Sequence, residues 1–169
     1  SLANTLNIPQ TDAKHFIDKY FEELPGIKKF LHALGNYGKK NGHIKTFKPF
    51  RRIRWFEDWS MLNSMDPGSK FKRLGEIERA SMNTPIQGSG ADMIKLALAL
   101  ISEKISKDNL YDKVKIVSQV HDEITCEVRD DFVKEWKLIQ EDLMVSAGKE
   151  ICQSVDMVVD GTTTQEWCK

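Results

Sequence analysis

Two short runs of alternating apolar residues, 114–120 and 124–128, are separated only by His121, Asp122 and Glu123. So short a separation predicts an antiparallel hairpin, in which the two runs are paired strands and the three polar residues lie at the turn. A solvated turn would explain the charges, because Asp is a common turn residue. A metal site is the alternative, because Mg²⁺ prefers oxygen ligands and needs only one or two protein carboxylates.

The alternation within each strand predicts which side chains share a face of the hairpin. We expect one face to pack on helices and the other to be available to a ligand. The packed face would consist of Ile116, Ser118, Val120, Ile124, Cys126 and Val128. The available face would carry Lys115, Gln119, His121, Thr125 and Glu127.

The other periodic segments are mostly helical. Apolar residues at helical spacing predict helices at residues 12–24, 25–40, 72–105 and 130–149, with a break in the third at residues 83–85. Outside them we expect an irregular extended hairpin at 43–55, a loop at 57–70 and a last short strand at 155–159. The fold class is therefore α+β, with long helices packed on a small antiparallel sheet.

The net charge is zero, but the charges are unevenly distributed. Residues 25–79 hold 13 Lys and Arg against 5 Asp and Glu, whereas residues 80–169 hold 10 against 16. A basic middle is typical of a surface that binds a polyanion, and a carboxylate-rich end is suited to cations. The charges alone are explained as well by solvated lysine-rich faces.

The sequence contains no run of about 18 apolar residues, which predicts no transmembrane helix and no membrane partner. Its first residues do not have the pattern of a secretory signal. The three cysteines, Cys126, Cys152 and Cys168, are sparse and lack the spacing of metal ligands. They indicate a reducing, cytosol-like compartment.

Three stretches resemble motifs of the family A DNA polymerases, the bacterial DNA polymerase I type. QVHDEITCEV is similar to the family's third polymerase motif, and ERASMNTPIQGSGADMIKLAL resembles the helix that lies along the primer–template. LNIPQTDAKHFIDKYFEELPGI, followed by NGHIKTFKPFRRIR, is similar to the segment between fingers and palm. The three stretches occur in the family's order and cover nearly the whole chain.

The resemblance implies a division of the chain into two parts of a polymerase. Residues 1–42 would be the helical end of the fingers, and residues 43–169 the C-terminal portion of the palm. Within the palm we expect a basic hairpin and loop at 43–70, a DNA-facing helix at 72–107, a catalytic hairpin at 113–128, and a helix and last strand at 130–160.

The resemblance also implies that the hairpin tip is catalytic. Asp122 would hold the two catalytic Mg²⁺ ions, with Glu123 as an auxiliary acid nearby. In two-metal phosphoryl transfer, one ion lowers the pKa of the primer 3′-hydroxyl and the other stabilises the triphosphate leaving group. Gln119 and His121 would contact the primer end, whereas outside this motif they would be polar strand residues that face water.

Arg79, Asn83 and Gln87 are four residues apart and therefore line one face of a helix. The resemblance implies that this face lies in the DNA minor groove, where the hydrogen-bond acceptors hardly vary with sequence. Donors in that position would test the geometry of a base pair without reading its sequence. The alternatives are a solvated helix face and, for Asn83 near Pro85, a turn or cap.

Arg51, Arg52 and Arg54 resemble the family's basic stretch after its hairpin. They would neutralise template or primer phosphates, which positions DNA without specifying its sequence. The segment 57–70, with Trp59, is longer than expected for bacterial members and indicates a divergent, phage-like or organellar branch. We expect the protein in the cytoplasm of a bacterium or phage-infected cell, with an organelle as the alternative.

The family's first polymerase motif, whose aspartate shares both metal ions, has no counterpart in this sequence, and neither has the fingers helix that binds the incoming nucleotide. We therefore expect the C-terminal part of a template-directed DNA polymerase, which adds dNTPs to a primer 3′ end only together with an N-terminal portion. Apolar surface would be exposed where that portion packs.

The alternative is a non-catalytic nucleic-acid-binding or scaffolding module derived from a polymerase. A stand-alone metal-dependent nuclease is less well supported, since the sequence has no second cluster of acids.

Overall fold

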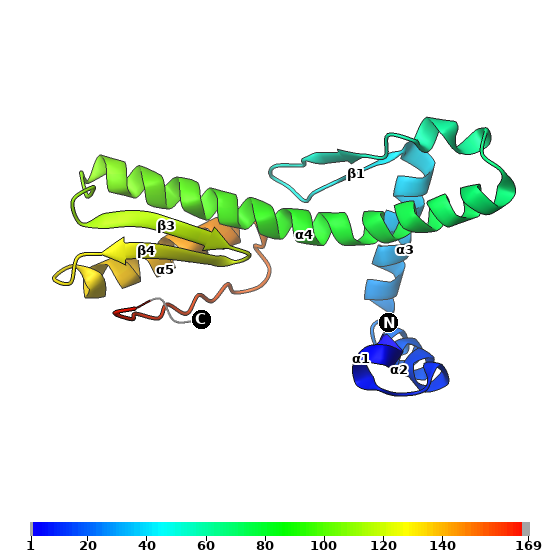
Figure 1. The fold of residues 1–169 in the computed structure, drawn as a ribbon, viewed down its shortest axis with the longest axis horizontal. Helices are drawn as coiled ribbons and strands as arrows, with labels where there is room; N and C mark the ends of the chain where they lie inside the picture. The colour runs from blue at the N-terminus through cyan, green and yellow to red at the C-terminus, as the bar shows by residue number, and fades with distance from the viewer. Residues whose placement is uncertain (1, 167–169) are drawn as a thin grey trace. The chain divides into compact units, whose positions relative to one another are not determined.

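The computed structural model describes residues 2–166 (Figure 1). Cys168 lies outside the described residues. The chain packs as two compact units, one made of Ser1–Ile44 with Ile53–Asn83 and the other of Lys45–Arg52 with Thr84–Lys169. This grouping by packing differs from the division into residues 1–42 and 43–169, which concerns polymerase parts and stays a prediction.

The first unit begins with three helices, α1 (Leu2–Leu6), α2 (Gln10–Glu23) and α3 (Pro25–Asn41). The last two confirm the helices predicted at residues 12–24 and 25–40. Pro25 is the first residue of α3, where a helix needs no backbone N–H. Gly42 ends α3 with a φ of 70°, and its N–H donates to the carbonyl of Gly38.

Strands β1 (His43–Lys45) and β2 (Ile53–Trp55) follow and pair with each other. They confirm the irregular extended hairpin predicted at residues 43–55. Between them, the N–H of Thr46 donates to the carbonyl of Arg52, which closes the intervening loop.

The segment 57–70 is not a loop, as predicted, but contains the 3₁₀ helix η1 (Trp59–Asn63) and the start of the next helix. The indole Nε1 of Trp59 donates to the Lys39 carbonyl at 2.8 Å. Leu62 is buried in the core of the first unit, together with Ile44, Phe56 and Ile77. The prediction was wrong because these two side chains anchor the segment on α3 and on the core, an effect of tertiary contacts that composition does not reveal.

Helix α4 (Pro67–Lys107) begins after Asp66, whose Oδ1 accepts from the N–H groups of Gly68 and Ser69, both at 3.0 Å. It continues through Pro85, so the predicted break at residues 83–85 is wrong, and so is the turn or cap role considered for Asn83. A proline inside a helix costs about 3 kcal/mol. Burial of the Pro85 ring, which is fully buried, offsets part of that cost.

No described helix, α4 included, is apolar enough over a sufficient length to cross a bilayer.

The second unit combines the C-terminal part of α4 with strands β3 (Val114–Val120) and β4 (Glu123–Val128) and helix α5 (Val133–Ile151). These elements confirm the predicted hairpin and the helix predicted at residues 130–149 (Figure 1). They share one core, made of Ala97, Ile101, Ile105, Leu110, Val114, Ile124, Phe132, Trp136 and Ala147. Long helices packed on a small antiparallel sheet confirm the α+β class.

The two strands pair with an irregularity that changes the expected faces. Val114 pairs with Val128 and Ile116 with Cys126, but beyond Val117 the partner of Ser118 is Thr125 and that of Gln119 is Ile124. Val117 is thus an extra residue in β3, which reverses the alternation toward the tip. Directly opposite residues share a face, so Gln119 shares the face of buried Ile124, whereas Ser118 and Val120 do not. The predicted face assignment is therefore wrong for residues 118–120 of β3.

No strand forms at residues 155–159, contrary to the prediction. Val155 and Val158 are 64% and 86% exposed, so this segment does not contribute its branched side chains to a sheet. Its contacts are with α5. Met157 packs so closely over Gly148 that a Cβ there would lie 2.8 Å from it, and the Gly161 N–H donates to Glu141 Oε1 at 2.9 Å.

Candidate active site at the hairpin tip

His121 and Asp122 form a two-residue turn, because Val120 pairs with Glu123 across the end of the sheet. His121 has a φ of 54°, in the left-handed region that residues other than glycine rarely adopt. The side-chain Nε2 of Gln119 donates to the His121 carbonyl at 2.7 Å. The structure therefore brings the four residues predicted for this site together, and Asp122 and Glu123 are both exposed.

The two carboxylates at the tip are of the chemical type that Mg²⁺ prefers. They are adjacent in sequence, with Asp122 in the turn and Glu123 at the start of β4. Their number is small, since no group of three or more His, Cys, Asp or Glu residues within residues 2–166 is arranged to hold a metal ion. The donor set thus fits part of a metal site, and a site for two ions needs further oxygen ligands.

A side chain of α5 forms a hydrogen bond with the backbone of β4 next to the tip. The sequence analysis did not predict this contact. Gln140 Nε2 donates to the Ile124 carbonyl at 2.9 Å, and Trp136 Nε1 donates to Gln140 Oε1 at 2.9 Å. Burial in the same region raises the pKa of the Cys126 thiol. The i, i+4 spacing of Trp136 and Gln140 is visible in the sequence, but their contact with β4 depends on how α5 packs.

The predicted basic residues of the loop between β1 and β2 have different environments. Arg51 is exposed, has a φ of 48°, and donates its N–H to the Phe47 carbonyl. Arg52 instead pairs with a buried acid, since its Nε lies 2.5 Å from Asp92 Oδ1. Its guanidinium also donates to the Gly88 carbonyl at 3.1 Å.

The loop is attached to α4 by further contacts that the sequence did not reveal. The Phe47 N–H donates to Ser89 Oγ at 3.0 Å, and the Arg52 N–H donates to Thr46 Oγ1 at 2.9 Å. A Cβ at Gly88 would lie 2.5 Å from Thr46 Cγ2, so only glycine permits this approach. The cluster of small residues at 88–90 indicates that another segment approaches the helix closely there. It does not indicate which segment does so.

The predicted helix stripe lies within α4, and its three members are all exposed. Arg79 and Asn83 belong to the first unit and Gln87 to the second. The uninterrupted helix supports the assumption of regular spacing on which the stripe was predicted. Contact of these residues with DNA remains a prediction.

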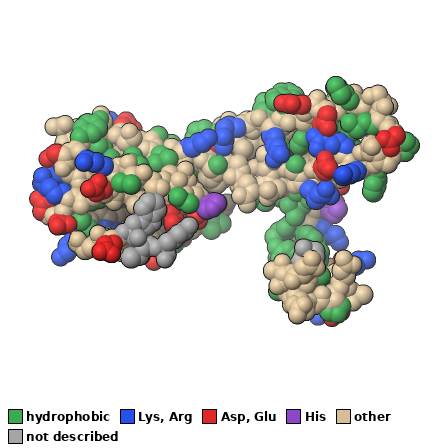
Figure 2. All heavy atoms as spheres, in the orientation of Figure 1, with side chains coloured by type: hydrophobic (Ala, Val, Ile, Leu, Met, Phe, Trp, Pro, Cys, Tyr) green, Lys and Arg blue, Asp and Glu red, His purple; other side chains and the backbone are tan. Residues whose placement is uncertain are grey.

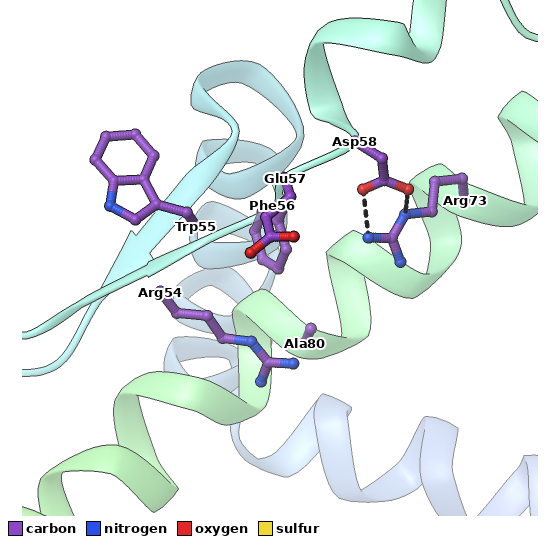
Figure 3. A pocket seen from close by; sticks show the side chains of 7 residues that line it. All are labelled: Arg54, Trp55, Phe56, Glu57, Asp58, Arg73 and Ala80. Carbon is purple, nitrogen blue, oxygen red and sulfur yellow. Dashed lines mark hydrogen bonds and ion pairs between the residues drawn. The ribbon is translucent and has the colours of Figure 1, made fainter.

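The first unit contains a pocket of about 340 Å³ beside β2 (Figure 3). Of the predicted site residues it includes only Arg54. Arg73 contacts both carboxylate oxygens of Asp58 at 2.6 Å, and this bond lowers the pKa of Asp58. Glu57 also lines the pocket, so the lining contains two arginines and two acids. The pocket is therefore not a strongly positive site.

Comparisons with known proteins agree with the resemblance seen in the sequence. Residues 1–169 match the family model described as DNA polymerase family A. DNA polymerase I of Caldicellulosiruptor bescii is 38% identical over 137 residues, which is 79% of this chain and 15% of that protein. DNA polymerase I of Streptococcus pneumoniae is 33% identical over 166 residues, 98% of this chain and 17% of that protein.

A solved structure is similar as well. The POL domain of Pol1 from M. smegmatis, in complex with DNA primer-template and dNTP, is 30% identical with a TM-score of 0.70. The match covers 86% of this chain and 24% of that chain. This chain therefore spans less than a fifth of the curated relatives named above and about a quarter of the solved chain.

Proposed function

The chain belongs to DNA polymerase family A, and on that basis we propose that it is the C-terminal part of a template-directed DNA polymerase, made of the end of the fingers and the C-terminal portion of the palm. Its role would be to hold the primer–template and a catalytic carboxylate while dNTPs are added to the primer 3′ end. The observation that carries the proposal is the position of Asp122, exposed at the tip of a hairpin whose base is anchored in a hydrophobic core.

Asp122 and Glu123 would be the residues of this chain that hold Mg²⁺. When bound, the ions supply a lowered pKa for the primer hydroxyl and neutralise charge on the phosphoryl group. The contribution of the chain is to present the Asp122 carboxylate on a short, paired hairpin rather than on a long loop. His121, beside it in the turn, would contact the primer end.

The DNA duplex would lie along α4. Arg79, Asn83 and Gln87 carry donor groups that reach minor-groove acceptors, which are nearly the same for every correct base pair. The exposed Arg51 would neutralise a backbone phosphate. Such contacts hold any correctly paired sequence, as a copying enzyme requires.

The remaining metal ligands and the nucleotide-binding part would come from an N-terminal portion of the polymerase. Three observations support this. The described residues supply only a partial carboxylate set, and the relatives are several times longer than this chain. Helices α1, α2 and α3, with the residue between the last two, also expose large apolar side chains: Leu2, Leu6, Phe16, Ile17, Tyr20, Leu24, Ile27 and Phe30. Figure 2 shows hydrophobic atoms in green along the segment that Figure 1 labels α3. Exposed apolar surface of this extent is typical of a surface that packs on another segment.

The test is to combine this chain with the N-terminal portion of its polymerase, and to measure both the mass in solution and primer extension. The proposal predicts a stable one-to-one complex that extends a primer, while neither part does so alone. The partial carboxylate set equally favours a non-catalytic DNA-binding module. A chain that binds duplex DNA alone with an affinity indifferent to Mg²⁺, and whose complex never extends a primer, would support that second function.

A further inference from the structure

Helix α5 contacts the hairpin of Asp122 through a side-chain amide as well as through the shared hydrophobic core. Gln140 Nε2 donates to the main-chain carbonyl of Ile124 at 2.9 Å. Ile124 is two residues beyond Asp122, and its side chain is buried in the core of the second unit. The amide therefore fixes the backbone of β4 immediately after the turn.

The indole of Trp136 determines which way this amide points. Trp136 is 2% exposed, and its Nε1 donates to Gln140 Oε1 at 2.9 Å. An indole can only donate, so the oxygen of the amide must face Trp136 and the nitrogen must face the Ile124 carbonyl. With the amide reversed, its nitrogen would meet the indole N–H and its oxygen would meet the Ile124 carbonyl, so both contacts would be repulsive and one orientation is favoured.

A second glutamine acts on the other side of Asp122. Gln119 is the register partner of Ile124, and its Nε2 donates to the carbonyl of His121 at 2.7 Å. The residues at positions −1 and +2 relative to Asp122 thus each have a carbonyl bound by a glutamine side chain. Because His121 has a left-handed φ, this bond also stabilises an otherwise unfavourable turn.

We propose that Gln140, oriented by Trp136, is a positioning residue for the Asp122 carboxylate. The inference deepens the proposed function and rests on it, because it assumes that Asp122 is the catalytic acid. Gln140 touches neither DNA nor metal in this proposal. It acts by keeping the tip in one conformation, so its loss lowers the rate of the chemical step rather than the binding of nucleotide.

The substitutions Gln140→Met and Gln140→Glu separate this role from simple packing. Methionine keeps a similar length and apolar stem but removes both hydrogen bonds. Ionised glutamate keeps an acceptor for Trp136 Nε1 but turns an oxygen toward the Ile124 carbonyl, so the bond to β4 is replaced by a repulsive contact while the bond to Trp136 remains. Lys134→Met is the matched control, since Lys134 is an exposed residue of the same helix.

The variants are made in the complete polymerase, and two properties are measured. In both Gln140 variants, backbone amides of residues 119–125 should exchange with deuterium about tenfold faster, because both lack the hydrogen bond to the Ile124 carbonyl. The maximal single-turnover rate of primer extension should fall about 10- to 100-fold, as expected for a misplaced catalytic group, with the KM for dNTP changed less than about twofold. Lys134→Met should change neither property.

Unchanged maximal rates in both Gln140 variants would overturn the inference, and so would a rate that falls only with the fraction of folded enzyme. A rise in KM without a fall in maximal rate would overturn it as well. The variant Asp122→Asn, measured in parallel, distinguishes failure of the positioning role of Gln140 from failure of the proposed function. If Asp122→Asn abolishes extension while Gln140→Met does not slow it, the positioning role fails and the proposed function stands. If Asp122→Asn extends primers normally, both fail.

Discussion

Arg52 Nε lies 2.5 Å from Asp92 Oδ1, and the Asp92 side chain is only 4% exposed while that of Arg52 is 45% exposed. The other carboxylate oxygen, Oδ2, is buried without a hydrogen-bond partner among the described residues. Arg52 is thus the neighbour that compensates a buried charge on α4. The pair attaches the loop 45–52 to that helix and gives Arg52 a structural role besides the predicted phosphate contact.

The salt dependence of DNA binding should distinguish Arg51 from Arg52. A lysine or arginine that contacts a phosphate contributes about one unit to the slope of log affinity against log salt concentration. Arg51→Ala should lower that slope by about 1, whereas Arg52→Ala should lower it by clearly less, since Asp92 already neutralises Arg52. Duplex binding at several salt concentrations provides the measurement. Equal losses of slope would show that Arg52 contacts phosphate as Arg51 does.

Removal of Arg52 should also destabilise the protein. Loss of Arg52 leaves the buried Asp92 carboxylate without its partner and costs about 1–3 kcal/mol, less than for a fully buried pair because the Arg52 side chain is 45% exposed. Asp92→Asn, added to Arg52→Ala, removes that charge and should recover a large part of the loss. The free energy of unfolding in denaturant is compared for the two single variants and the double variant. Additive losses would mean that the two residues do not stabilise each other.

Gly42 should not tolerate a side chain. Its φ is 70°, and a Cβ would lie 2.7 Å from the ring of Trp59. Gly42→Ala should therefore lower the free energy of unfolding by about 2 kcal/mol, through backbone strain and overpacking. Gly26→Ala is the control, because a Cβ there would have no neighbour within 4 Å. It lies inside α3 and should be neutral or stabilising by up to about 1 kcal/mol. Similar effects at the two positions would contradict the packing of Trp59 described above.

His121 allows its turn geometry and its side chain to be tested separately. Glycine adopts a φ near 54° without strain, so His121→Gly should keep the hairpin intact while it removes the imidazole. His121→Val should disturb the turn, because a β-branched residue is strongly disfavoured there. Deuterium exchange of residues 119–125 reports the turn, and primer affinity reports the imidazole. If His121→Gly binds primer as well as the unsubstituted polymerase does, the predicted contact with the primer end is absent.

Helix ends and strands that depend on a few neighbouring residues were predicted correctly from the sequence. The Asn41-Gly42 pair marked the end of α3, and two alternating runs marked the hairpin and its tip. The residues of the tip were therefore brought together as expected. Their chemical roles came from the resemblance to a family, because the tripeptide alone fits a solvated turn equally well.

The errors have tertiary causes. The extra residue Val117 reverses the faces of β3 near the tip, and the alternation of the sequence gives no sign of it. The burial of Pro85 within α4 and the contact of Met157 with Gly148 of α5, where a strand was predicted, both depend on tertiary packing, which local patterns do not indicate. The contact of Gln140 with β4 and that of Arg52 with Asp92 join residues 16 and 40 positions apart, so no local pattern could indicate them.

Primer extension by the complete polymerase with Asp122→Asn tests whether the carboxylate of Asp122 is catalytic. Asparagine keeps the size of the side chain and removes the charge that would hold Mg²⁺, and Asp130→Asn provides an exposed control beyond the other end of β4. Loss of a metal-binding charge removes several kcal/mol of transition-state stabilisation, so we expect a rate lower by about a thousandfold or more for Asp122→Asn. Asp130→Asn should keep the rate within about twofold, since an exposed residue away from the site contributes little. Extension by Asp122→Asn at the rate of the unsubstituted enzyme would contradict a catalytic role of Asp122.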